Sequence, residues 1–185
     1  MIYNVSQLMK SAPGTTLDVE LDNEDGLDLR EGEADLVGPV TGQLRMHRTN
    51  QGIYVDGIVR TAVRLQCTRC LREFTQALEF PLREEFYPTV DVTSGAPVSG
   101  PHDADAFAID SHHQVDLREP IRQALVLALP MKPLHSEDCA GLCPRCGKDL
   151  NDGPCGCPPE ELDERFTALR ALFPDAGNAG DNETR

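Results

Sequence analysis

Seven cysteines are the residues of this chain best suited to chemistry, and five of them lie in the stretch DCAGLCPRCGKDLNDGPCGC, residues 138–157. Two C-x2-C pairs occur, CTRC at 67–70 and CPRC at 143–146. This spacing lets one tight turn direct two thiolates at a single tetrahedral ion, as in structural zinc sites. One such pair is a weak signal, whereas two pairs with further cysteines nearby predict metal binding.

The C-terminal stretch contains a set of thiols that closes on itself. CPRC is followed by Gly147, which suits a turn because glycine accepts a positive φ. A second turn, Asn-Asp-Gly-Pro at 151–154, leads into a C-x-C pair. We expect this set to bind one zinc ion, with the ligands Cys143, Cys146, Cys155 and Cys157.

Three cysteines remain, Cys67, Cys70 and Cys139, and they need a fourth ligand. His135 precedes Cys139 in an H-x3-C pattern, and with it the count becomes eight ligands for two zinc ions. A competing partition pairs the two C-x2-C turns with each other, as in a zinc ribbon, and leaves His135, Cys139 and the C-x-C pair for the second ion. We favour the first partition because residues 143–157 close a short loop, at a smaller cost in loop entropy.

Other uses of the cysteines are less well supported. A disulfide framework is disfavoured because the count is odd and the first ten residues, MIYNVSQLMK, do not read as a secretory signal. An iron–sulfur cluster remains an alternative for four thiolates.

We expect no enzyme, because catalytic zinc keeps an open coordination position and both predicted sites are filled. No phosphate-binding glycine loop or nucleophile motif occurs either.

Basic residues are concentrated in one segment of an acidic chain. The formal net charge is −14 at pH 7, yet residues 43–72 hold six arginines against one acid, Asp56. Binding of nucleic acid depends on Lys and Arg that neutralise phosphates, so this segment is the candidate RNA surface; a solvated sheet face is the alternative. With two basic residues near the second C-x2-C pair, the candidate RNA contacts are Arg60, Arg64, Arg69, Arg72, Arg145 and Lys148.

The pattern of apolar residues predicts an α+β fold with a small antiparallel sheet. We expect a short helix at 4–10, a strand at 15–21, and three or four strands between 34 and 87 with a turn at 50–52. Along IVRTAVRLQC, the period of two puts Val59, Thr61, Val63 and Leu65 on one face and the arginines on the other.

Two further helices are expected. Asp116 is placed as an N-cap, with Glu119 completing a capping box before the apolar run IRQALVLAL, which Pro130 ends. This helix is apolar nearly all round, so we expect it to be buried beneath the sheet. The last helix is expected at 159–173, with Pro159 at its start.

The predicted organisation has three parts. An antiparallel-sheet core with the buried helix spans 1–134 and contains a loop at 88–114, with a short strand at DAFAI. A zinc-knuckle segment with the C-terminal helix spans 135–173, and a disordered tail spans 174–185. No run of eighteen or more apolar residues occurs, so we expect no membrane span and a cytoplasmic location.

Four stretches, CTRCL, LPMKPLHSEDCAGLCPRCGKDLN, CGC and DERFTAL, resemble the YceD-type family of bacterial and plastid proteins, named for accumulation of large-subunit ribosomal RNA. The similarity covers about residues 57–172, and it implies a cytosolic, zinc-bound protein that supports biogenesis of the large ribosomal subunit. Many relatives carry Cys where this chain has His135. We expect a non-catalytic factor that binds ribosomal RNA or a pre-ribosomal particle. The alternative is a protein–protein adaptor whose acidic surface binds a basic ribosomal protein.

Overall fold

The computed structural model describes residues 1–24, 27, 29, 34–98 and 106–158. The described elements follow one another in the order β1 (Ile2–Asn4), α1 (Ser6–Lys10), β2 (Thr16–Glu24), β3 (Asp35–Leu36), β4 (Val40–Arg48), β5 (Ile53–Gln66), β6 (Glu73–Pro88), β7 (Phe107–Ile109), β8 (Gln114–Asp116), α2 (Arg118–Ala128) and the short 3₁₀ helix η1 (Leu150–Asp152). The chain divides into two compact units, Met1–Gly141 and Leu142–Arg185.

A six-stranded sheet dominates the first unit. Its strands lie in the order β2-β4-β5-β6-β7, and β3 pairs with the C-terminal half of β5. All neighbours are antiparallel except β7, which runs parallel to β6. The predicted α+β class with a small antiparallel sheet is confirmed, and the strands expected between 34 and 87 are β3 to β6.

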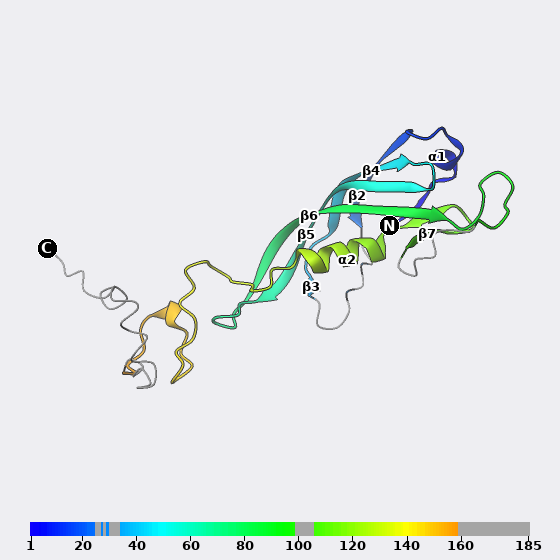
Figure 1. Ribbon diagram of the computed structural model, residues 1–185. Coiled ribbons are helices and arrows are strands. Elements are labelled where there is room, and N and C mark those ends of the chain that lie inside the picture. Colours follow the sequence, from blue (N-terminus) through cyan, green and yellow to red (C-terminus); the bar gives the residue numbers. More distant parts are fainter. Residues whose placement is uncertain (25–26, 28, 30–33, 99–105, 159–185) are drawn as a thin grey trace, which may run out of the picture. The chain divides into compact units, whose positions relative to one another are not determined.

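The core lies on one face of this sheet. Along β5 the buried and exposed positions alternate, and Val59 and Val63 are fully buried while Arg60 and Arg64 are exposed, as the period of two predicts. Helix α2 packs against β6 (Figure 1). We call the opposite, solvated face of the sheet the outer face.

Helix α2 is buried on one face only. Ile121 and Leu125 are fully buried, whereas Leu127 on the opposite face is 87% exposed. The expectation that the helix is buried beneath the sheet therefore holds for the face with Ile121 and Leu125 and not for Leu127. The N-cap of the helix is Leu117 and not Asp116 as predicted, because α2 begins at Arg118; Oδ1 of Asp116 still accepts a hydrogen bond from the backbone N–H of Arg118 at 3.0 Å.

The hairpin between β4 and β5 turns at 50–52, as predicted. The N–H of Thr49 donates to the carbonyl of Gly52 at 3.0 Å. Gly52 is required here because β6 passes so close that a Cβ at this position would lie 2.0 Å from the carbonyl oxygen of Phe86.

Two strands were not expected from the sequence. β1 pairs with β8 in a separate antiparallel sheet, in which Tyr3 lies opposite Val115. The segment predicted as a loop at 88–114 contains β7, where a short strand was expected, and the first residue of β8. The helix predicted at 159–173 and the tail predicted at 174–185 lie outside the described residues. Among those that are described, no helix is both long and apolar enough to span a membrane.

Candidate metal centres

The long β5–β6 hairpin positions the first C-x2-C pair at its closed end. The two strands pair in one register along the whole of β5, and the turn that joins them holds Cys67 and Cys70. The N–H of Cys67 donates to the carbonyl of Arg72 at 2.9 Å, and the N–H of Leu71 donates to the carbonyl of Cys67 at 2.9 Å. Leu71 takes a left-handed conformation, with φ 61°. Both cysteines are buried inside the turn.

The segment that follows α2 crosses this turn and carries the other two donor residues. We call it the crossing segment, residues 133–139. The N–H of Thr68 donates to the carbonyl of Pro133 at 2.9 Å, which holds the segment against the hairpin just before His135. Further along, the N–H of Cys139 donates to the carbonyl of Ser136 at 3.1 Å and turns the Cys139 residue back toward the hairpin.

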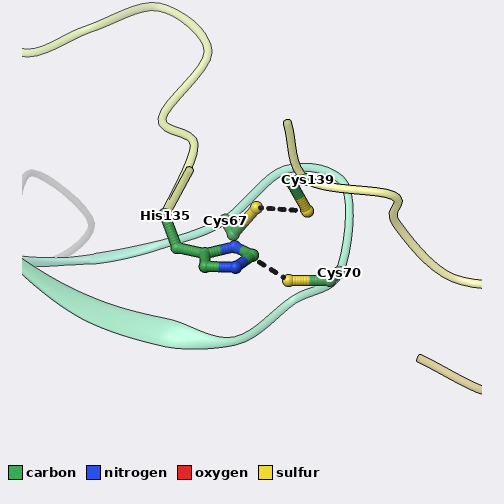
Figure 2. A group of neighbouring side chains, drawn as sticks. All are labelled: Cys67, Cys70, His135 and Cys139. Carbon is green, nitrogen blue, oxygen red and sulfur yellow. Dashed lines mark hydrogen bonds between the residues drawn. The ribbon is translucent and has the colours of Figure 1, made fainter. Parts of the chain in front are cut away.

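Four donors consequently meet at the end of the hairpin, and we call this group the hairpin site: Cys67, Cys70, His135 and Cys139. The Sγ atoms of Cys67 and Cys139 lie 3.7 Å apart, and Sγ of Cys70 lies 3.3 Å from Nδ1 of His135. Figure 2 shows the four side chains converging on one point, two from the hairpin turn and two from the crossing segment. All four donor atoms lie within 4.8 Å of one another.

These separations fit a tetrahedral ion with sulfur and nitrogen ligands. Bonds of about 2.3 Å to sulfur and about 2.0 Å to nitrogen put two sulfur ligands about 3.8 Å apart and a sulfur and a nitrogen about 3.5 Å apart. The observed 3.7 Å and 3.3 Å are close to these values. None of the seven cysteines, all of which lie in the described residues, forms a disulfide.

A second group of donors lies within the second unit, and we call it the loop site: Cys143, Cys146, Cys155 and Cys157. Its four sulfur atoms also lie within 4.8 Å of one another. Cys143 is buried, Cys146 is exposed, and the C-x-C pair is half-buried. The donor atoms thus group as in the partition that we favoured, with each set able to hold one metal ion.

The two C-x2-C turns share one hydrogen-bond pattern. In the loop site the N–H of Cys143 donates to the carbonyl of Lys148 at 2.8 Å, and the N–H of Gly147 donates to the carbonyl of Cys143 at 2.9 Å. Gly147 has φ 70° and occupies the position that Leu71 occupies in the hairpin site. The same backbone fold therefore directs two thiols inward in each site.

Two thiols of the hairpin site, Cys67 and Cys70, have pKa values shifted in opposite directions. Burial acts to raise the pKa of Cys67, but a hydrogen bond from the His135 side chain and bonds from backbone N–H groups outweigh it and lower the pKa to about 5. Burial raises the pKa of Cys70, and the neighbouring Cys67 and Cys139 thiols raise it further.

The loop site likewise contains one thiol with a lowered pKa and one with a raised pKa. Hydrogen bonds from the backbone N–H groups of Cys146 and Arg145 lower the pKa of Cys143 to about 6. Cys157 has its pKa raised to about 12 by the adjoining Cys146 thiol and by burial. Crowded thiols oppose one another's ionisation, and a divalent cation at the centre removes that opposition.

Among the six candidate RNA contacts, Arg60, Arg69 and Lys148 donate side-chain hydrogen bonds within the protein. Nε of Arg60 donates to Glu79 at 2.6 Å across the outer face. Nη1 of Arg69 donates to the carbonyls of Cys139 at 2.9 Å and Glu137 at 3.3 Å. Nζ of Lys148 donates to the carbonyl of Pro154 at 2.9 Å. All six residues are exposed at the surface.

Thr68 was not among the residues singled out from the sequence. Its contact with Pro133 runs through the backbone N–H and through Oγ1, which donates to the same carbonyl at 3.3 Å. The backbone bond does not depend on the residue type, and the position of Thr68 between Cys67 and Cys70 is the sequence feature that could have indicated it.

Comparison with known proteins decides the family. A sequence profile described as "Large ribosomal RNA subunit accumulation protein YceD" matches residues 55–173, more than half of the chain. The chain belongs to the YceD family. The resemblance seen in the cysteine motifs is thereby confirmed, and the family's description refers to accumulation of large-subunit ribosomal RNA.

Individual relatives of this YceD-family chain come from bacteria and plants. An uncharacterized protein of Mycobacterium tuberculosis is 33% identical over 127 residues, which cover 68% of this chain and 58% of the relative. The "Large ribosomal RNA subunit accumulation protein YCED homolog 1, chloroplastic" of Zea mays is 27% identical over 176 residues, 80% of this chain and 59% of the relative. The Arabidopsis thaliana protein of the same name is 26% identical over 155 residues, 72% of this chain and 48% of the relative.

The chain spans about half to three-fifths of the length of these relatives. No solved structure matches it.

Proposed function

We propose that this YceD-family protein is a non-catalytic, cytoplasmic zinc-binding factor that supports accumulation of large-subunit ribosomal RNA by binding that RNA or a precursor particle. The observation that carries the metal part is the convergence of two four-donor sets of sulfur and nitrogen atoms. The family match carries the ribosomal part. Four protein ligands fill a tetrahedral zinc, so a structural role is favoured over a catalytic one, which keeps a position open for water.

Zinc would supply the hairpin site with a link between parts of the chain that are distant in sequence. Cys67 and Cys70 come from the β5–β6 turn, whereas His135 and Cys139 follow α2. The residues fit this role because they are buried or half-buried and already converge. In the loop site all four ligands come from one short segment, so zinc there would order that segment alone.

The exposed arginines of the first unit would bind the RNA. Arg64 lies exposed on the outer face of β5, four residues after Arg60 on the same face. Arg60 is bonded to Glu79, but this pair is more than half exposed and exchanges partners at small cost in free energy. Phosphate groups of RNA would compete for such a guanidinium group.

The experiment is RNA capture with the tagged, zinc-loaded protein, followed by sequencing of the bound RNA at several salt concentrations. Binding through phosphates predicts enrichment of large-subunit ribosomal RNA and a steep loss of binding with rising salt. The Arg60→Ala/Arg64→Ala variant should bind more weakly and lose part of the salt dependence. Lys10→Ala/Lys132→Ala removes the same charge from other exposed positions and is the matched control. Unchanged binding by the arginine variant would refute this RNA surface.

A second candidate, an adaptor for a basic ribosomal protein, is favoured by the charge pattern of the outer face. Three basic side chains there are already paired with acids: Arg45 with Asp18, Arg60 with Glu79, and His47 with Asp56, each at 2.6 Å. Glu20 lies beside them, opposite Gln43. The adaptor predicts capture of a basic ribosomal protein that survives ribonuclease treatment and is weakened by Asp18→Asn/Glu20→Gln.

A further inference from the structure

Arg69 stands inside the C-x2-C pair of the hairpin site, and its side chain reaches across to the segment that carries the other two ligands. Its Nη1 donates to the carbonyl of Cys139 at 2.9 Å and to that of Glu137 at 3.3 Å. One of these carbonyls belongs to a proposed metal ligand itself. From this geometry we propose that Arg69 is a positioning residue for the hairpin metal site, holding Cys139 in place for the ion.

The crossing segment is held at two points, one on each side of His135. Before it, Pro133 accepts hydrogen bonds from the backbone N–H and Oγ1 of Thr68. After it, Arg69 holds the carbonyl of Cys139. Both clamps come from the two residues between Cys67 and Cys70. The C-x2-C turn at 67–70, the knuckle of this site, therefore supplies two of the ligands. It also makes the hydrogen bonds that hold the crossing segment with the other two ligands.

The chain past Cys139 also packs against Arg69. Gly141 has φ 75°, and a Cβ built there would lie 3.3 Å from the backbone oxygen of Arg69 and 3.4 Å from its Cβ. A side chain at this position would press on Arg69 and would also require a strained backbone. Arg69 thus lies against the chain at Cys139 and again at Gly141.

Arginine suits this position better than lysine would. A guanidinium group presents several N–H donors in a fixed plane, so one side chain can satisfy two backbone carbonyls at once. Three thiolates and one neutral imidazole around a divalent cation leave one net negative charge, and a guanidinium group close by offsets it. Partners of metal ligands that fix their orientation typically change metal affinity by about 10- to 100-fold when removed.

Lys148 makes the corresponding contact in the loop site. It lies two residues past the second cysteine of that knuckle, and its Nζ donates to the carbonyl of Pro154, directly before Cys155. In both sites a cation in or just after the C-x2-C pair donates to a backbone carbonyl at or next to a ligand from the other pair. This parallel favours a role in the metal sites for two residues that the sequence suggested as RNA contacts.

The test rests on the proposed metal sites and reads them separately. Cadmium-loaded full-length protein should give two cadmium NMR resonances, because three sulfurs with one nitrogen and four sulfurs shift the signal differently. Arg69→Ala should shift or broaden only the resonance of the hairpin site. It should also weaken zinc there by about 10- to 100-fold in competition with a chelator. Arg69→Lys should recover part of the loss, and Arg83→Ala, which removes an exposed charge on β6, should match the parent.

Three results would overturn the proposal. Parental affinity and spectrum in Arg69→Ala would show that the contact does not position the ligand. Equal weakening of both sites would show a general loss of folding. If Arg69→Ala does not fold, Arg69→Lys is the milder change, because it keeps the long side chain and its charge. A parent protein that binds no zinc or cadmium would remove the proposed metal sites themselves, and is thereby distinguished from failure of the Arg69 role.

Discussion

Leu71 and Gly147 occupy the same place in two knuckles, each four residues after the first cysteine and each left-handed, with φ 61° and φ 70°. Each donates its N–H to the carbonyl of that cysteine at 2.9 Å. The left-handed region suits glycine and costs other residues about 1–2 kcal/mol. One knuckle therefore carries a strained residue where the other carries a relaxed one.

Gly147→Ala should weaken the loop site. No atom lies within 4 Å of a Cβ built on Gly147, so the substitution brings only the backbone cost, about 1 kcal/mol. We expect about a fivefold loss of zinc affinity at that site, measured by chelator competition. Leu71→Gly is the reciprocal variant and should leave the affinity of the hairpin site unchanged or slightly raised. A parental affinity for Gly147→Ala would contradict the assignment of the knuckle turn.

His135→Ala should lower the melting temperature of the whole first unit. The ion at the hairpin site would join the sheet to the segment after α2, and structural zinc contributes about 10–16 kcal/mol of apparent binding free energy in small peptides. Since each kcal/mol corresponds to about 2–4 °C in a chain of this length, we expect a fall of more than about 10 °C. His135→Cys should retain most of the melting temperature.

The control for His135 is the loop site. Cys155→Ser/Cys157→Ser removes two ligands from a single short segment, so its effect on the melting temperature should be smaller than that of His135→Ala. Thermal melts with metal counts on all three variants decide the matter. If His135→Ala still holds two zinc ions and melts like the parent, His135 is not a ligand.

The cysteine sets could be predicted from the sequence because C-x2-C and C-x-C spacings determine local geometry. The alternation in β5 could be predicted for the same reason, since one residue after another faces opposite sides of a strand. The contacts of Arg60 and Arg69 could not, because each depends on a partner brought close by the register of β5 with β6 or by the path of the chain after α2. The exposure of Leu127 likewise depends on which face of α2 meets the sheet.

Two leucines of α2 should differ sharply in their contribution to stability. Leu125 is fully buried against the core, whereas Leu127 is 87% exposed. Leu125→Ala should cost about 2–5 kcal/mol in the free energy of unfolding, because it leaves a cavity. Leu127→Ala should change it by less than about 0.5 kcal/mol. Chemical denaturation of both variants checks the orientation of α2, and similar losses for the two would contradict it.

Asp116 should stabilise the start of α2 in a pH-dependent manner. A hydrogen bond from the Arg118 side chain is the largest cause that lowers the pKa of Asp116 below its ordinary value of 3.8. A lowered pKa means stability that is present above pH 3.8 and lost as the pH falls through the folded-state pKa. Because the Asp116–Arg118 pair is about half exposed and screened by solvent, Asp116→Ala should cost less than about 1 kcal/mol at pH 7, and the difference from the parent should shrink below pH 3.8.

Asp116→Asn separates the two contributions of this side chain. Its amide oxygen can still accept from the N–H of Arg118, but it carries no charge and does not titrate. We expect a loss smaller than that of Asp116→Ala, without the change at low pH. A difference between parent and Asp116→Ala that stays constant from pH 7 to pH 3 would argue against the pairing with Arg118.

Metal content measured on the intact protein tests the central claim most directly. Native mass spectrometry with elemental analysis of protein produced in zinc-supplemented medium should find two zinc ions per chain, one for each four-donor set. A single ion per chain, or iron with a visible charge-transfer band, would contradict the two-site account.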